Sequence, residues 1–177
     1  MDGQKMKSLI KKAKHGDCES FGMLYAEYMK ELYRFALYVL KKPEDAEDAV
    51  QNAAIIAFKK MGSLKKDDSF KSWFFKILFN ECRKIISSKS RAYEMPCEDI
   101  GIYDESIPDF SSGTDLLSLL DELSERDKAI VILSVFDNLT SEEIAEILSM
   151  KPATVRSRLS RLLFALRKQI EGVNNEK

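Results

Sequence analysis

Residues 139–161 read LTSEEIAEILSMKPATVRSRLSR, and this stretch decides the fold. Its first half carries a capping box, because Thr140 is followed three residues later by Glu143, and this spacing predicts a short helix over 141–148. A tight turn follows, and Pro152 suits the first position of a second helix. The stretch therefore predicts a helix-turn-helix.

The second helix of this motif is basic on one side. Residues 151–170 carry six basic side chains and no acid, while apolar residues at helical spacing supply its buried side. Such a face suits a recognition helix, since arginine can pair with guanine edges and hydroxyl groups and lysines can hold phosphates. A solvated face on a structural helix is the alternative, but the capping box, turn and proline start occur together here and favour DNA binding. The candidate DNA-binding residues are Lys151, Thr154, Arg156, Ser157, Arg158, Ser160 and Arg161.

Outward from this motif, the whole chain reads as all-α, because apolar residues recur at helical spacing and no period-two stretch is present. In residues 1–92, a long helix runs to about Leu40 and ends before Pro43, since proline disfavours helix in the residue that precedes it. A second helix starts there and stops at Gly62. The polar loop 63–69 then leads into a third long helix.

Charge and composition divide the chain into two small helical domains. Residues 1–92 form the first domain, and residues 114–177 form the second. Between them, residues 93–113 are rich in acids, glycine, proline and serine, which indicates a flexible acidic linker. The net charge of −1 hides basic stretches in both domains, and that pattern suggests a polyanion as one partner and a second partner elsewhere.

The sequence also excludes several classes of protein. No run of 18 apolar residues is present, and the lysine-rich beginning does not resemble a secretory signal, so we expect a soluble protein in the cytoplasm. No glycine-rich phosphate loop, clustered metal ligands or nucleophile beside a base is present, so we expect neither an enzyme nor a cofactor. A zinc site is conceivable but weakly indicated, because its four possible ligands are widely spread: His15, Cys18, Cys82 and Cys97.

Two motifs in order carry a family resemblance. DAEDAVQ at 45–51 and FKSWFFKI at 70–77 resemble sigma region 2, and the two helices around 139–161 resemble sigma region 4. Their order and the linker between them resemble the extracytoplasmic-function (ECF) subfamily of the bacterial sigma-70 factors. The resemblance covers about 20–170. It implies a protein that binds core RNA polymerase, directs it to promoters through their −35 and −10 elements and assists promoter melting.

The resemblance gives the acidic helix a partner. In that family this helix docks on the clamp helices of the largest polymerase subunit, and here it offers Asp45, Asp48, Gln51 and Asn52. Asn52 and Ala54 depart from the family's usual glutamate and aromatic residue, which puts the strength of docking in question. A purely structural reading is that the carboxylates stabilise the positive end of their own helix.

The resemblance also assigns the basic stretch at 59–91, which has a net charge of +7. In the family this stretch melts the −10 element and holds splayed bases of one strand, one of them in the loop that is 63–69 here. Trp73 lies on the apolar stripe of its helix, so we interpret it as a core residue. The candidate −10 residues are Lys60, Lys65, Lys66, Lys71, Lys76 and Asn80.

Further partners follow from the resemblance alone. The polymerase flap is a second docking surface, and an anti-sigma factor, usually membrane-bound, is the expected regulator. The acidic linker would run through the polymerase toward its active-site and RNA-exit channels, or serve only as a solvated spacer. The alternative function is an ordinary helix-turn-helix regulator that binds DNA as a dimer, which predicts symmetric half-sites and leaves the acidic helix unexplained.

Overall fold

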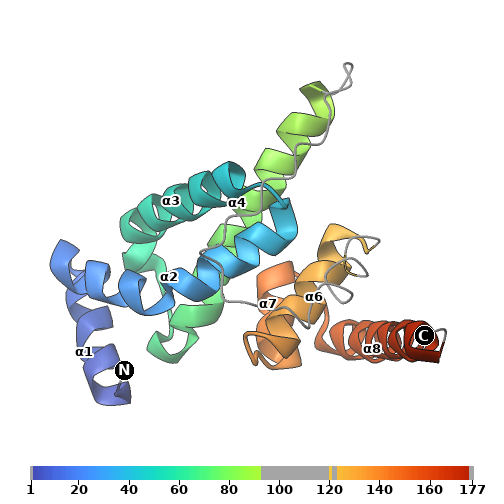
Figure 1. The fold of residues 1–177 in the computed structure, drawn as a ribbon. Helices are drawn as coiled ribbons and strands as arrows, with labels where there is room; N and C mark the ends of the chain where they lie inside the picture. The colour runs from blue at the N-terminus through green and yellow to red at the C-terminus, as the bar shows by residue number, and fades with distance from the viewer. Residues whose placement is uncertain (1, 93–119, 121–122, 176–177) are drawn as a thin grey trace.

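A computed structural model describes residues 2–92, 120 and 123–175 of the chain, and every secondary-structure element within them is a helix (Figure 1). This confirms the all-α prediction. The N-terminal unit contains α1 (Gly3–Lys14), α2 (Cys18–Leu40), α3 (Pro43–Lys60) and α4 (Phe70–Ala92), with 3₁₀ turns η1 (Met61–Ser63) and η2 (Asp67–Ser69) between α3 and α4. The C-terminal unit contains α6 (Glu125–Val135), α7 (Ser141–Leu148) and α8 (Pro152–Asn175).

The breaks between the N-terminal helices follow the sequence signals. Lys41 closes α2 in the left-handed conformation, with φ of 65°, and its backbone N–H donates to the Leu37 carbonyl. Pro43 then occupies the first turn of α3, where its missing N–H costs no hydrogen bond. At the other end of α3 the chain tightens into η1 and not into an open loop. The predicted break at Pro43 and stop near Gly62 are confirmed.

Aromatic side chains of α2 and α4 form the core of the N-terminal unit. Phe35 is fully buried and contacts the rings of Phe75 and Phe79, with centroids 5.5 and 6.4 Å apart. Phe70 contacts Trp73 and Phe74 within α4. Trp73 packs against this core but is only partly buried, so the core interpretation of Trp73 is confirmed in part.

The helix-turn-helix forms as the sequence predicts. Thr140 accepts from the Glu143 backbone N–H at 3.3 Å, and the Glu143 carboxylate accepts from the Thr140 N–H at 2.8 Å, which completes the capping box. Ser149 ends α7 in the left-handed conformation, with φ of 53°. This turn points α8 away from α7, and Val155, fully buried, fixes the crossing of the two helices.

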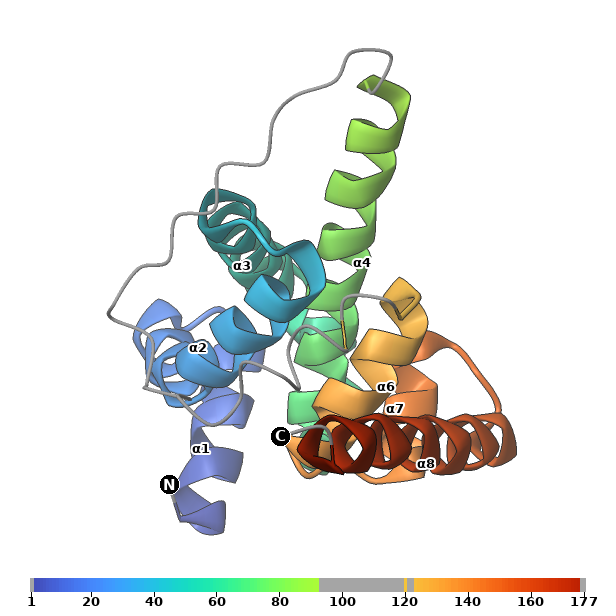
Figure 2. The same ribbon diagram turned by 45° about the vertical axis from the view of Figure 1, so that its right-hand side comes forward.

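The two units pack against each other, with α6 and α7 beside α2 and α4 (Figures 1 and 2). Buried residues of both units belong to one continuous core. At the seam, the ring of Tyr38 lies 5.6 Å from that of Phe136, and Arg34 forms an ion pair with Asp137. The predicted linker, 93–113, lies outside the described residues.

Membrane spans and metal sites were both considered from the sequence, and the described residues can be searched for each. None of the helices described is both long enough and apolar enough to cross a bilayer. In the same residues no three His, Cys, Asp or Glu side chains gather as metal ligands would. Cys82 is fully buried and Cys18 is exposed, while Cys97 falls outside the described part.

Candidate nucleic-acid interface

The outward face of α8 presents most of the predicted recognition residues to solvent. Lys151 and Thr154 are exposed in the first turn, where a recognition helix enters a groove. Arg156 is exposed and pairs with Glu142 of α7 at 2.8 Å. Arg158 is less open, because it reaches back to Asp127 of α6 at 3.0 Å. The remaining three predicted residues, Ser157, Ser160 and Arg161, are exposed.

These contacts give the face its electrostatic character. The Arg156–Glu142 pair is exposed on both sides, so it is weak and can give way to a base or a phosphate. Arg158 lies at the flank, where its pair with Asp127 holds α8 on α6. The structure therefore brings six of the seven predicted residues to one exposed face and gives Arg158 a packing contact as well.

The outer face of α4 forms a second cationic surface. Lys76 and Asn80 are both exposed and lie one helical turn apart. Arg83 continues the same row, seven residues after Lys76, and is exposed as well. The partly exposed Trp73 begins this row. We call Trp73, Lys76, Asn80 and Arg83 the α4 row.

Lys71 lies on a different side of α4. Its ammonium group is 2.8 Å from the Glu31 carboxylate and donates to the Asp137 carbonyl at 3.1 Å. It also sits 5.9 Å from the centre of the Phe75 ring. The structure therefore does not bring Lys71 together with Lys76 and Asn80, because the C-terminal unit occupies its side of the helix.

The loop between α3 and α4 has an apolar base and a basic rim. Met61 and Leu64 are buried and anchor the loop in the core. Lys65 and Lys66 are exposed beside them, and so is Lys60 at the end of α3. Two of the predicted −10 residues therefore lie on this loop, and a third, Lys60, lies at the end of α3 that leads into it.

The exposed face of α3 differs in character from these cationic surfaces. Asp48, Gln51 and Asn52 are all exposed on adjacent turns, as predicted. Asp45, one turn before Asp48, is less open than these residues, because its side chain forms an ion pair with Lys89 of α4. Ile55, one turn beyond Gln51, is 53% exposed at the centre of the face. We call Asp48, Gln51, Asn52 and Ile55 the α3 face.

Ala54 does not weaken this face by its small size. Its side chain is half-buried and packs against the core of the N-terminal unit. The departure from the family's aromatic residue at this position is therefore a change in packing beside the core. Asn52, by contrast, is exposed on the α3 face, where it offers an amide in place of a carboxylate.

Asp137 is a buried titratable group at the seam between the units. Its side chain is buried, and this burial raises the pKa of the carboxyl group, while the neighbouring Arg34 and Lys71 act in the opposite direction. One carboxylate oxygen, Oδ2, has no hydrogen-bond partner among the described residues. The seam therefore holds an incompletely satisfied charge, which is expensive to bury.

Arg83 and Ile55 were not predicted from sequence. The offsets of Arg83 from Lys76 and Asn80, seven and three residues, are those of neighbours on one helix face, so spacing contained the signal. Ile55 gave no such signal, because an isoleucine in an amphipathic helix is more often core than surface.

Comparison with known families covers most of the chain. Residues 24–92 match the family model described as Sigma-70 region 2, and residues 114–165 match that of Sigma-70, region 4. The chain is 34% identical to the RNA polymerase sigma factor SigV of Bacillus subtilis (strain 168), over 81% of this chain and 87% of SigV. It is 27% identical to the ECF RNA polymerase sigma factor SigW of the same organism, over 95% and 98% of the two chains.

Two solved structures share the fold. One is CnrH in complex with the cytosolic domain of CnrY, with a TM-score of 0.72 and 19% identity over 95% of this chain and 98% of that one. The other is the sigma factor RpoE with the anti-sigma factor NepR from Bartonella quintana, with a TM-score of 0.73 and 24% identity over 86% and 98%. At these identities the likeness extends to the fold alone.

Proposed function

The chain belongs to the ECF subfamily of the sigma-70 RNA polymerase sigma factors, and from this premise we propose how its surfaces divide the work of initiation. As a member of this non-catalytic family it binds core RNA polymerase and directs transcription initiation. The observation that carries the division is the segregation of exposed charge: the predicted DNA-binding cations lie on α8, on α4 and from the end of α3 into the following loop, while residues 48–55 of α3 expose carboxylate, amide and apolar groups and contain no basic residue.

The α3 face docks on the clamp helices of the largest polymerase subunit. Asp48, Gln51 and Asn52 can pair with a basic coiled coil, and their exposure leaves them free to do so. Asp45 contributes indirectly, since its pair with Lys89 fixes α3 against α4. An apolar residue within a polar rim is the usual composition of a binding hot spot, and Ile55 occupies that place.

The loop 61–69 and the α4 row hold the −10 element. Lys60, Lys65 and Lys66 supply phosphate contacts, and Lys76 and Asn80 continue them along α4. Unstacked bases gain about 1–3 kcal/mol each from an aromatic surface in such grooves. Trp73 is partly exposed where the row begins and is the aromatic side chain of the row that could contact such a base. Lys71 joins this set only when the C-terminal unit leaves α4.

The outward face of α8 reads the −35 element in the major groove. Its first turns carry Lys151, Thr154 and Arg156, and the next turn carries Ser160 and Arg161. Arginine pairs with guanine, and the hydroxyl groups contact either bases or phosphates. Ser157 and Arg158 complete the set at its centre and flank.

The packed arrangement cannot read both elements at once. About 25 base pairs separate −35 from −10, which is about 85 Å along B-DNA at 3.4 Å per base pair. A compact chain of this length has a radius of gyration of about 16 Å. The two units therefore separate on the polymerase, which breaks the seam between Arg34 and Asp137 and releases Lys71.

We further propose a cytoplasmic site of action, with the polymerase flap as a second docking surface and an anti-sigma factor as regulator. One of the structures of similar fold, that of RpoE, contains an anti-sigma factor, which supports this choice of partner. A regulator that holds the two units together would keep Lys71 covered and the reading faces too close for a promoter.

Run-off transcription tests the function directly. Core RNA polymerase of Bacillus subtilis, mixed with this protein and with a promoter mapped by sequencing the transcripts its expression induces, should yield a specific transcript that neither protein yields alone. An ordinary helix-turn-helix regulator would give no transcript with core enzyme, and that outcome would contradict the proposal.

A further inference from the structure

Helix α1 lies outside the segment that matches the region 2 family model, which begins at residue 24. It nevertheless contacts both 3₁₀ turns of the loop between α3 and α4. This loop, residues 61–69, carries Lys65 and Lys66, which the proposed function assigns to promoter DNA. The contact between α1 and this loop contains two ion pairs.

The apolar face of α1 holds the helix firmly on the N-terminal unit. Leu9, Ile10 and Ala13 are buried against α2. The Tyr28 hydroxyl group donates to the Met6 sulfur at 3.3 Å, and the Tyr28 ring contacts Phe70 at the start of α4. The position of α1 is thereby fixed relative to the helix that follows the loop.

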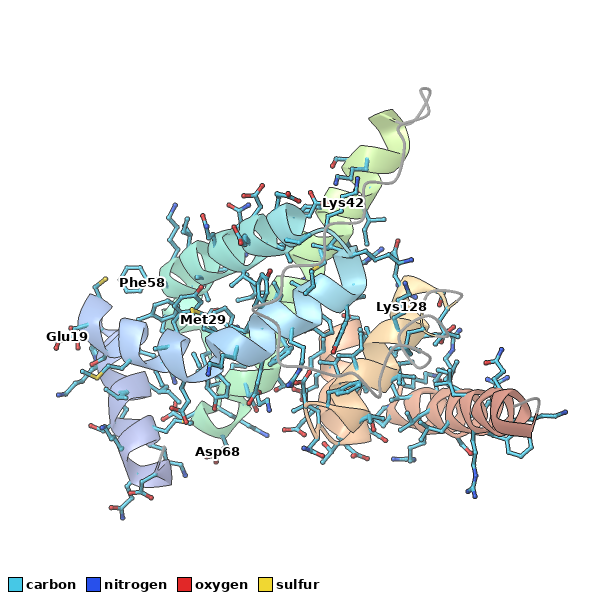
Figure 3. The ribbon with its side chains drawn as sticks, viewed as in Figure 1. Glu19, Met29, Lys42, Phe58, Asp68 and Lys128 are labelled. Carbon is cyan, nitrogen blue, oxygen red and sulfur yellow. The ribbon has the colours of Figure 1, made fainter. Side chains whose placement is uncertain are left out.

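Two lysines of α1 reach the loop. Lys14 lies 2.5 Å from the Asp67 carboxylate, and the two side chains are only 23% and 21% exposed. Lys7 lies 3.0 Å from Asp68, which projects from the lower edge of the molecule in Figure 3. The inner pair is partly shielded from water and is the stronger of the two, whereas the outer pair is exposed and weak.

These ion pairs neutralise two carboxylates of the loop that would oppose the binding of DNA. Asp67 and Asp68 directly follow Lys65 and Lys66, so two carboxylates stand beside the groups that would hold phosphate. Unpaired, they would repel a DNA backbone and cancel both lysines. Paired with Lys14 and Lys7, they leave the rim of the loop positive.

We propose that α1 is part of the −10 recognition unit, with Lys14 as a positioning residue that holds Asp67 and thereby the loop in its DNA-binding form. Lys7 assists by neutralising Asp68. The ligand whose binding this supports is single-stranded promoter DNA, and the inference rests on the proposed role of the loop.

Charge reversal at the inner pair tests the proposal. Holoenzyme carrying Lys14→Asp should form open complexes on the mapped promoter at least about fivefold less than wild type, as expected from loss of one charge-assisted contact. The readout is fluorescence of 2-aminopurine placed in the −10 element. Affinity for core polymerase should stay within about twofold, because the α3 face does not contact α1's lysines. The exchange Lys14→Asp with Asp67→Lys should restore opening.

Lys11→Asp is the matched control, since it reverses the same charge at an exposed position in the last turn of the same helix, where the described residues form no ion pair with Lys11. Thermal unfolding of each variant identifies a folding defect, and Lys14→Gln supplies a milder change. The inference is wrong if Lys11→Asp impairs opening equally, if the exchange fails to restore it, or if the loss of opening follows a loss of polymerase affinity or of folding stability. If wild-type holoenzyme opens no promoter, the proposed function itself fails, and the inference falls with it.

Discussion

Ser149 shows how one residue sets the angle of the recognition helix. It ends α7 with φ of 53°, a conformation in which a β-carbon crowds the backbone, and its N–H donates to the Ala145 carbonyl. A residue other than glycine incurs a penalty of about 1–2 kcal/mol there. Ser149 therefore holds the turn in a strained conformation.

Replacing Ser149 by glycine should therefore stabilise the protein by about 1 kcal/mol, because glycine adopts the left-handed conformation without crowding. Urea unfolding measures this difference. Glu146→Gly, on the exposed side of α7, is the control and should destabilise by about 1 kcal/mol. If both substitutions destabilise, the turn is unstrained.

Cys82 is a core thiol and not a reactive one. It is fully buried in α4, and burial raises its pKa to about 12. At neutral pH it is therefore protonated and shielded. Iodoacetamide should modify exposed Cys18 in the folded protein and reach Cys82 only on unfolding, as measured by mass spectrometry of the peptides. Modification of Cys82 at the rate of Cys18 would contradict this burial.

At the scale of the element, α3 combines two functions on opposite sides. Its alanines at 46, 49, 53 and 57 are buried and allow close packing on α2 and α4, while Ile55 stands exposed among polar groups. A large exposed apolar side chain gains free energy when a partner covers it. This makes Ile55 the expected apolar centre of polymerase docking and a contact that offsets the amide at Asn52.

Ile55→Ala should lower the affinity for core polymerase by about five- to tenfold, since a central apolar residue of an interface contributes more than about 1 kcal/mol. Fluorescence anisotropy of labelled protein titrated with core enzyme measures it. Met23→Ala is the control, because it removes an exposed apolar side chain that lies on α2 and not on the α3 face. Equal losses for the two variants would remove Ile55 from the docking face.

Local signals predicted the elements, and long-range packing decided the rest. The capping box, Pro43 and Pro152 act within a few residues of themselves, so the boundaries of α3, α7 and α8 could be predicted. Lys71 and Lys76 look alike in sequence. Which one is covered depends on Asp137, 66 residues beyond Lys71, and helical spacing contains no information about such a contact. The pairing of Asp45 could not be predicted either, because its partner Lys89 lies on another helix.

At the scale of the whole molecule, the seam between the units contains a buried charge that is incompletely paired. Arg34 and Lys71 both reach Asp137 from the N-terminal unit, but one Asp137 oxygen and the Arg34 Nε lack partners among the described residues. Removing a charge from water is costly unless it is fully paired. This incomplete pairing lowers the stability of the packed arrangement relative to a seam in which every polar atom has a partner.

The seam should tighten as the pH falls. The pKa of Asp137 is raised in the packed arrangement, so its carboxyl group binds a proton more tightly there than when exposed. Protonation favours packing as the pH falls through the raised pKa, and the effect is complete below the ordinary value of 3.8. Energy transfer between dyes on α1 and α8 should therefore rise as the pH is lowered from neutral toward the ordinary carboxyl pKa of 3.8. Asp137→Asn should flatten this dependence, and an unchanged slope in that variant would assign it to another group.

The central claim is that promoter reading and polymerase docking reside on separate surfaces of one chain. The most direct measurement compares Arg156→Ala with Arg161→Ala, as a double variant, against wild type in two assays: binding of a −35 duplex and association with core polymerase. The account predicts that duplex binding is lost while polymerase association is unchanged. A fall in polymerase association as large as that in duplex binding would contradict it.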